Sequence, residues 1–153
     1  MTAQDPKEII KLLDGIPLFR GLNEKEKKSL ADLKAVVVRH KTEEKIITQG
    51  DIDLRLFVLL KGNVVVAKNE NPNKILARLN RGDIFGEVSF ISKRPRMANV
   101  IADGEAYILR LDGEQFETLP IGVQNKLREH LIDLLVRRLD VMNTNILPFL
   151  RYH

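Results

Sequence analysis

The middle of the chain constrains the fold most, because short β-branched or alternating apolar runs follow one another over residues 35–111. Glycine, asparagine, aspartate or proline separates the runs, as expected of strands joined by turns. No segment long enough for a crossover helix lies between them, which disfavours a parallel sheet. About eight strands in roughly eighty residues predict a sandwich or a jelly-roll barrel. The runs are Val36–Val38, Ile46–Ile47, Leu56–Leu60, Val64–Val66, Ile75–Leu76, Asn99–Ala102 and Ala106–Leu111.

Helix signals precede this β region. Asp5 before Pro6 is typical of an N-cap followed by proline at the first helical position. Asn23 with Glu26 has the spacing of a capping box and predicts a second helix. Asn69 to Asn73, inside the β region, is rich in turn residues and predicts an exposed hairpin tip.

Helix signals also follow the β region. Asp112 with Gln115 predicts a short helix, and a long helix is expected from about Ile121 to Ile146, before Pro148. Its apolar residues form two adjoining stripes, which is wider than one packing seam requires. One stripe could cover the barrel while the other pairs with a second copy, so we consider a homodimer through this helix. The first stripe is Leu127, Leu131, Leu134 and Val141, and the second is Ile132, Leu135, Leu139, Met142 and Ile146.

Composition limits the class of protein. With 153 residues, 44% of them hydrophobic, the chain fits one domain over residues 1–153: N-terminal helices at about 5–34, a β-roll at about 35–111 and C-terminal helices at about 112–147. The absence of cysteine excludes disulfides, thiolate zinc sites and iron–sulfur clusters. No signal peptide or membrane-length apolar segment is recognisable, so we expect a cytoplasmic protein without a membrane partner.

The segment over residues 82–100 carries the residues for an anion and sugar site. Gly86 allows backbone to approach a ligand closely, and successive N–H groups after it can form an anion-binding concavity. Glu87 offers an acceptor for hydroxyl groups. Arg96 offers a permanent charge on a planar fork that suits a phosphate.

These residues resemble the phosphate-binding cassette of the cyclic nucleotide-binding domain family, of the catabolite activator protein and protein kinase A regulatory subunit type. The likeness covers roughly residues 16–145 and includes Ile46–Asp51, Leu56–Leu59 and Gly62 at similar spacing. It implies a mainly β fold with flanking helices: an eight-stranded double-stranded β-helix (jelly roll), N-terminal helices, a short cassette helix and a long C-terminal helix. The matching cassette residues are Phe85, Gly86, Glu87, Pro95, Arg96, Ala98 and Val100.

The resemblance implies a regulatory sensor that uses no cofactor and binds a cyclic nucleotide, with cyclic AMP expected and cyclic GMP as an alternative. Arg96 and N–H groups of residues 86–89 would hold the phosphate, and Glu87 would accept a hydrogen bond from the ribose 2′-hydroxyl. Ligand binding would move the long helix. By alignment of that helix, Met142 and Asn143 would face the base. The expected ligand-binding residues are Phe85, Gly86, Glu87, Val88, Ser89, Arg96, Met97, Ala98, Met142 and Asn143.

The cassette departs from the family pattern at a few positions. Met97 stands where many members have serine, threonine or alanine, so a hydroxyl that could reach a guanine is absent and cyclic GMP is less favoured. Asn99 replaces the usual serine or threonine, and Ser89 replaces a smaller residue. Neither change removes a required charge.

Two other functions remain open. A β-roll that has lost its ligand could serve as an interaction module. A cupin-like metalloenzyme would need clustered ligands, but His40, His130 and His153 show no metal-ligand spacing. No serine lies in a nucleophile-elbow motif, and we expect no catalytic residues.

The partner of such a sensor is not specified by the residues. After Ile146 only residues 147–153 follow, too few for a helix-turn-helix, so we expect no direct DNA binding. The output would therefore pass to an effector protein that the sequence does not identify.

Overall fold

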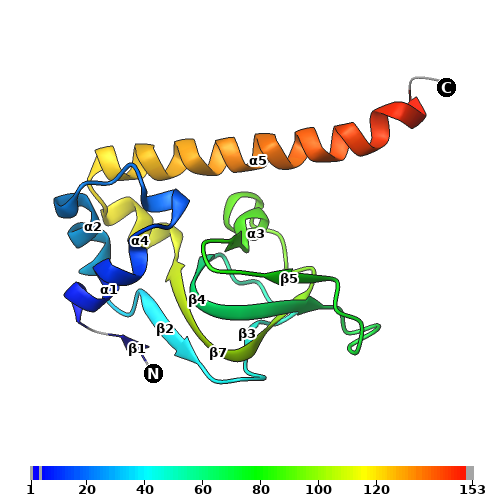
Figure 1. Ribbon diagram of the computed structural model, residues 1–153, viewed down its shortest axis with the longest axis horizontal. Coiled ribbons are helices and arrows are strands. Elements are labelled where there is room, and N and C mark those ends of the chain that lie inside the picture. The colour runs from blue at the N-terminus through cyan, green and yellow to red at the C-terminus, as the bar shows by residue number, and fades with distance from the viewer. Residues whose placement is uncertain (1, 4, 151–153) are drawn as a thin grey trace.

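The computed structural model describes the backbone of residues 2–3 and 5–150 and the side chains of residues 5–141. Within this part of the chain, seven strands form one antiparallel sheet in the order β1-β2-β7-β4-β5, with β3 also paired to β7 and β6 to β4. The mainly β class with flanking helices is thus confirmed (Figure 1). The strands are β1 Thr2–Ala3, β2 Val37–His40, β3 Lys45–Ile47, β4 Leu56–Ala67, β5 Ala77–Leu79, β6 Ile84–Phe85 and β7 Asn99–Leu111.

The expected count of eight strands is not confirmed, and the jelly-roll detail stays a prediction. Four of the apolar runs join pairwise into the two long strands β4 and β7. The join within β4 passes through Gly62, whose φ is 95° and whose Cβ, if present, would lie 2.2 Å from the carbonyl oxygen of Glu105. Glycine therefore bends the strand where the sequence suggested a turn. Ile75 and Leu76 lie before β5 and are exposed.

The helices begin at the predicted caps. The Asp5 side chain accepts a hydrogen bond from the Lys7 amide at 3.0 Å, and capping boxes are present at Asn23 and Asp112. The long helix was expected to end near Ile146, but it continues past Pro148, because a proline so near the end removes only one of the last hydrogen bonds. The helices are α1 Pro6–Leu13, η1 Pro17–Phe19, α2 Glu24–Ala31, α3 Glu87–Ser92, α4 Gly113–Thr118 and α5 Ile121–Leu150.

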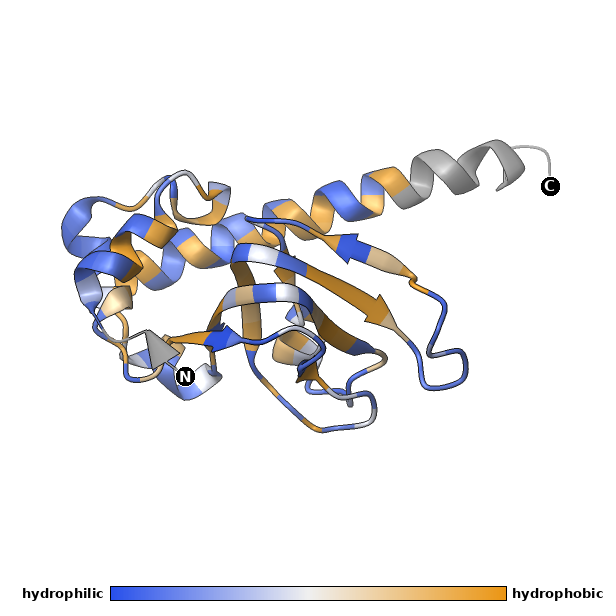
Figure 2. Cartoon of the chain, turned by 60° about the horizontal axis from the view of Figure 1, so that its bottom comes forward, coloured by the Kyte–Doolittle hydropathy of each residue, from blue (hydrophilic) through white to orange (hydrophobic). Residues whose placement is uncertain are grey.

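Two hydrophobic clusters form the core. One lies where the N-terminal helices, α4 and the first half of α5 meet one end of the sheet, and Phe19, Leu30 and Leu127 are among its buried members. The other lies inside the roll and contains Phe57 and Phe85. Figure 2 shows the apolar stretches of the long strands along the interior. The predicted cassette follows β6 and therefore lies beside the second cluster.

Burial separates the two apolar stripes of α5 only in part, since Val141 of the first stripe is exposed and Leu135 of the second stripe is partly buried. Leu127 and Leu131 of the first stripe are buried, whereas Ile132 and Leu139 of the second stripe are exposed. Figure 1 shows α5 crossing the N-terminal helices and α3 and continuing beyond the roll. The side chains of Met142 and Ile146 lie outside the described residues. No helix in the described part of the chain is both long and apolar enough to span a membrane.

Candidate functional site

The cassette is built on a glycine that no other residue could replace without movement. Gly86 is the N-cap of α3, and its φ of 76° lies in the left-handed region that favours glycine. A Cβ at this position would lie 2.7 Å from Nη1 of Arg96 and 2.9 Å from Cδ2 of Phe57. Gly86 therefore lets the start of α3 and the guanidinium of Arg96 approach each other closely.

The cassette opens on a cavity of about 260 Å³. Most of its wall is apolar, and Glu87, Ser89 and Arg96 are polar residues within it. Eight of the ten predicted site residues line this cavity, namely 85–89 and 96–98. Met142 and Asn143, the two others, lie outside the described side chains. The lining residues are Ile47, Val66, Phe85, Gly86, Glu87, Val88, Ser89, Arg96, Met97, Ala98 and Val100.

Arg96 is almost fully buried, with 3% of its side chain exposed. Nη1 donates to the carbonyl of Gly86 at 2.8 Å, and Nη2 donates to the carbonyl of Arg55 at 2.5 Å. The carboxylate of Asp53 lies 3.7 Å from Nη2. Burial lowers the pKa of Arg96, and Asp53 opposes this effect; a guanidinium stays protonated in either case. The Nε group is buried and has no acceptor among the described residues.

Aromatic rings support the charged group. The guanidinium carbon of Arg96 lies 5.3 Å from the centroid of the Phe57 ring, which is itself stacked on Phe85 at 5.2 Å. Arg55 lies 5.8 Å from the same ring and pairs with Asp53 at 2.9 Å. These contacts hold the cation within the wall of the cavity, where solvent screens it less than at the surface.

Glu87 is the second charged residue of the cavity and is also buried. Its carboxylate forms an ion pair with Arg138 of α5. Nη2 of Arg138 donates to the carbonyl of Ile84 at 3.0 Å, directly before the cassette. One side chain of α5 therefore contacts both the carboxylate in the cavity and the strand that leads to it.

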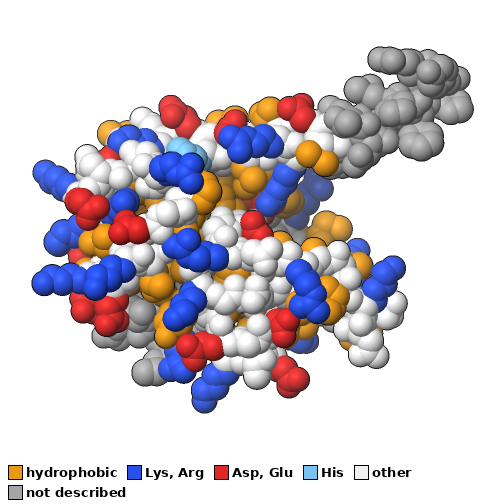
Figure 3. Space-filling view, viewed as in Figure 1, with side chains coloured by type: hydrophobic (Ala, Val, Ile, Leu, Met, Phe, Trp, Pro, Cys, Tyr) orange, Lys and Arg blue, Asp and Glu red, His pale blue; other side chains and the backbone are white. Residues whose placement is uncertain are grey.

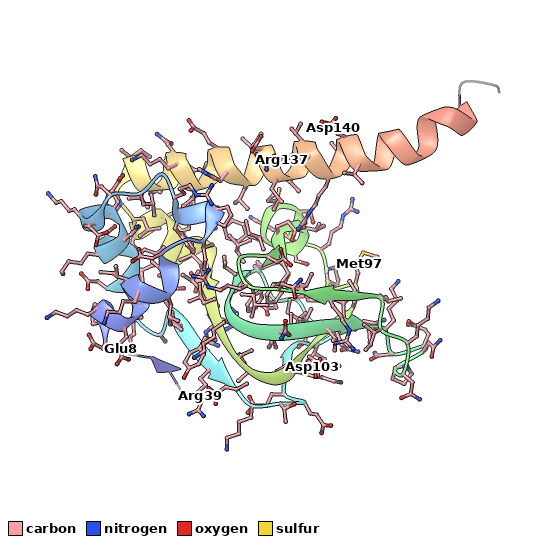
Figure 4. All side chains as sticks on the ribbon, in the orientation of Figure 1. Glu8, Arg39, Met97, Asp103, Arg137 and Asp140 are labelled. Atoms are coloured by element: carbon pink, nitrogen blue, oxygen red, sulfur yellow. The ribbon has the colours of Figure 1, made fainter. Side chains whose placement is uncertain are left out.

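The rim of the cavity is apolar and exposed. Val88 and Met97 both line the cavity and have more than half of their surface exposed. Figure 4 shows Met97 at the side of the roll, below the C-terminal half of α5. In the space-filling view the surface is hollowed between α5 and the roll (Figure 3). A flat ligand that entered the cavity would contact these apolar side chains at its mouth.

Comparison with known proteins identifies the family. Residues 37–120, more than half of the chain, match the model of the cyclic nucleotide-binding domain. This chain belongs to that family. The cavity described above lies in the matched segment of the cyclic nucleotide-binding domain, and the prediction of the family from the cassette is confirmed.

Individual relatives agree with this membership. The domain is 29% identical to the cAMP-dependent protein kinase regulatory subunit of Dictyostelium discoideum over 135 residues, which are 85% of this chain and 41% of that protein. It is similar in structure to a cyclic nucleotide-binding domain from Methylobacillus flagellatus, at 26% identity and a TM-score of 0.71, covering 94% of this chain and 83% of the other. Catabolite activator protein of Thermus thermophilus has 28% identity and a TM-score of 0.71, covering 89% and 63%. The family model and the Methylobacillus flagellatus structure are named for cyclic nucleotide binding, and the Dictyostelium discoideum relative is a regulatory subunit. The domain is therefore a binding and regulatory domain and not an enzyme.

Sequence reasoning missed several residues of the cavity and its supports. Ile47 of β3 and Val66 of β4 line it on either side of Val100 of β7, which was matched to the cassette but not expected to bind the ligand. The alternation of apolar residues could have suggested that they face inward, but not that they face this cavity. Asp53 and Arg138 were also missed, because each contacts the cassette from far along the chain.

The metal-site alternative gains no support from the arrangement of the histidines. His40 contacts Glu44, and His130 contacts the carbonyl of Lys126. No group of three or more histidine or carboxylate side chains suited to a metal ion occurs among the described residues.

Proposed function

We propose that this cyclic nucleotide-binding domain is a sensor for cyclic AMP, with the cyclic phosphate on Arg96 and the ribose 2′-hydroxyl on Glu87. One observation carries the proposal: a buried arginine lines a mostly apolar cavity and keeps its Nε without an acceptor among the described residues. A buried charged donor without a partner is costly, and a bound phosphate would supply one. The N–H groups at the start of α3 have no partner within their helix and add further donors.

The preference for adenine rests on the rim of the cavity. Met97 has no hydroxyl to bond the exocyclic group of guanine, and its thioether packs on either purine ring. The relative from Dictyostelium discoideum is by name the regulatory subunit of a cAMP-dependent protein kinase, which favours cyclic AMP as the ligand here. Met142 and Asn143 remain our candidates for contacts with the base.

The ion pair between Glu87 and Arg138 offers a route from the ligand to α5. A ribose hydroxyl and Arg138 would both bond to the Glu87 carboxylate. Ligand binding would therefore change the ion pair that connects Glu87 with α5. Binding would shift the population of α5 positions in this way. We therefore propose that signalling through the long helix begins at this contact.

Two partners belong to this proposal. The exposed stripe of α5, represented by Ile132 and Leu139, would pair with a second copy of the chain. The output would pass to an effector chain, and the similarity to a protein kinase regulatory subunit favours a kinase for that role. The match spans less than half the length of that relative.

Titration calorimetry with cyclic AMP, cyclic GMP and non-cyclic AMP tests the proposed ligand. We expect saturable binding of cyclic AMP, weaker binding of cyclic GMP and none of non-cyclic AMP, whose doubly charged, extended phosphate does not match one buried guanidinium. Tighter binding of cyclic GMP would overturn the preference for adenine. No heat and no thermal stabilisation with either cyclic nucleotide would instead support a β-roll that serves as an interaction module.

A further inference from the structure

Asn99 is a buried amide at the point where the wall of the cavity ends. It is the first residue of β7, the strand that lies between β3 and β4. The last paired positions there are Ile47 with Val100 on one side and Ala67 with Asn99 on the other. Beyond these pairs, no strand ladder among the described residues holds the three chain segments together. Only 4% of the Asn99 surface is exposed.

The Asn99 side chain joins the two segments that flank it. Its Oδ1 accepts a hydrogen bond from the main-chain N–H of Gln49 at 2.8 Å, and its Nδ2 donates to Oδ1 of Asn69 at 2.7 Å. The Gln49 side chain also bonds to the hairpin. Its Oε1 accepts from the main-chain N–H of Asn69 at 2.8 Å, and its Nε2 donates to the Glu70 carboxylate at 2.9 Å. The tip of the β4–β5 hairpin is thereby tied to the loop after β3. We call these four residues, Gln49, Asn69, Glu70 and Asn99, the amide clamp.

The same loop holds the main chain of Arg96. The Gly50 amide donates to the carbonyl of Arg96 at 2.8 Å, and the Arg96 amide donates to the carbonyl of Asp51 at 2.8 Å. Residues 49–51 are therefore bonded both to the backbone of Arg96 and to the side chain of Asn99. The cavity residues 97 and 98 lie between these two attachments. A shift of the loop would move the backbone that carries the guanidinium.

We propose that Asn99 is a positioning residue of the nucleotide site, which fixes Arg96 by tying the loop at 49–51 to the hairpin tip at 69–70. The inference rests on the proposed function, because the site it serves is the cyclic nucleotide cavity. An amide suits this role since it offers a donor and an acceptor on opposite sides of one planar group, whereas a hydroxyl joins them at one atom. The hairpin tip, although remote in sequence, thereby becomes part of the ligand-binding unit.

The hairpin offers a matched set of variants that do not disturb the core. Asn69 and Asn73 are both exposed residues of the same hairpin, but only Asn69 bonds to Asn99. Asn69→Ala removes the acceptor for Nδ2 of Asn99, and Asn69→Asp restores an acceptor at that position. We expect Asn69→Ala to raise the dissociation rate of cyclic AMP about 3- to 10-fold, the range for one lost hydrogen bond. Asn73→Ala and Asn69→Asp should stay near the wild-type rate.

Hydrogen exchange of main-chain amides in the ligand-free protein tests the amide clamp independently of whether cyclic AMP is the ligand. Asn69→Ala should speed exchange at the Gly50 and Arg96 amides, with little change in the melting temperature. Wild-type binding with unchanged dissociation in Asn69→Ala would overturn the positioning role. If wild type binds no cyclic nucleotide, the proposed function fails; unchanged exchange at Gly50 and Arg96 would then overturn the clamp as well. Asn99→Ala should show the same effects as Asn69→Ala if it folds.

Discussion

Arg96 makes two kinds of contact. It holds two main-chain carbonyls in place, and it brings a positive charge to the wall of the cavity. We predict that Arg96→Ala lowers the affinity for cyclic AMP at least about a hundredfold, since an unpaired buried phosphate costs about 3–5 kcal/mol. Calorimetry measures this loss, and Arg94→Ala, at an exposed position in the same loop, should bind as wild type does.

The structural role of Arg96 must be separated from its role in binding. Arg96→Ala also leaves the carbonyls of Gly86 and Arg55 without their donor, so its melting temperature should fall. Arg96→Lys keeps a charge but replaces the fork by a point donor, and we expect intermediate affinity. Near wild-type affinity in a folded Arg96→Ala protein would contradict the phosphate assignment.

Gly86 is the residue at which backbone conformation and the site depend on each other. We predict that Gly86→Ala destabilises the fold by about 1–3 kcal/mol, because a Cβ is strained at a φ of 76° and would clash with Arg96. Cyclic AMP affinity should fall too, as the guanidinium has to move. Urea unfolding and calorimetry measure the two effects. Gly113→Ala, where a Cβ meets nothing within 4 Å, is the control and should be nearly neutral.

The cassette was predictable at the residue scale because its parts lie close together in the chain. Gly86, Glu87 and Arg96 fall within eleven residues, and residue type alone indicates what each can bind. Asp53 and Arg138 were not predictable in the same way. Their contacts depend on how β4 and α5 are placed, and many exposed charges in the sequence look the same.

Between elements, the pair of Arg138 and Glu87 connects α5 with α3. We predict that cyclic AMP changes hydrogen exchange of residues 121–141 in the wild type, and that Arg138→Gln reduces this change. The reason is that the substituted helix no longer competes for the Glu87 carboxylate. Arg137→Gln is the matched control, since Arg137 pairs with Asp133 on α5 itself. Equal responses in all three proteins would argue against coupling through Glu87.

A second contact of α5 gives the fold a dependence on pH. The Glu26 carboxylate accepts hydrogen bonds from Lys126 and from the main-chain N–H of Asn23. These bonds hold the pKa of Glu26 below the ordinary value of 4.5. A lowered pKa in the folded state means that the unfolded state binds the proton more tightly. This contribution to stability is therefore present above about pH 4.5 and is lost as the pH falls through the folded pKa.

Glu26→Gln tests this pH dependence. The glutamine keeps an acceptor for the Asn23 amide but cannot lose a proton, so we predict a flatter fall in melting temperature between about pH 5 and pH 3. Identical slopes for wild type and Glu26→Gln would show that the pair does not stabilise the fold.

Element type was easier to predict than element extent. The caps at Asp5, Asn23 and Asp112 act over three residues, so they could be recognised locally. The number of strands could not, because glycine marks both turns and bends within strands. Gly62 bends β4 instead of ending it, a difference set by the Glu105 carbonyl on the neighbouring strand.

Across the whole molecule, the two hydrophobic clusters support different parts of the fold. The cluster around the N-terminal helices anchors the first half of α5, whereas the cluster inside the roll supports the cavity. The C-terminal end of α5 extends beyond the roll (Figure 1). In the proposed coupling, the beginning of α5 would stay fixed while the part beyond this cluster would respond to the site.

We expect the exposed stripe of α5, with Ile132 and Leu139, to determine whether the chain forms a homodimer. In a two-fold dimer each substitution on the stripe counts twice, because the same surface contributes from both copies. We predict that Leu139→Ala weakens a homodimer by about 2 kcal/mol, roughly thirtyfold in its dissociation constant. Sedimentation equilibrium over a range of concentrations measures this constant. Arg137→Ala, on the same helix but off the stripe, should leave it unchanged. A wild-type protein that stays monomeric at all accessible concentrations would remove the second copy from the proposal and leave the stripe to an effector chain.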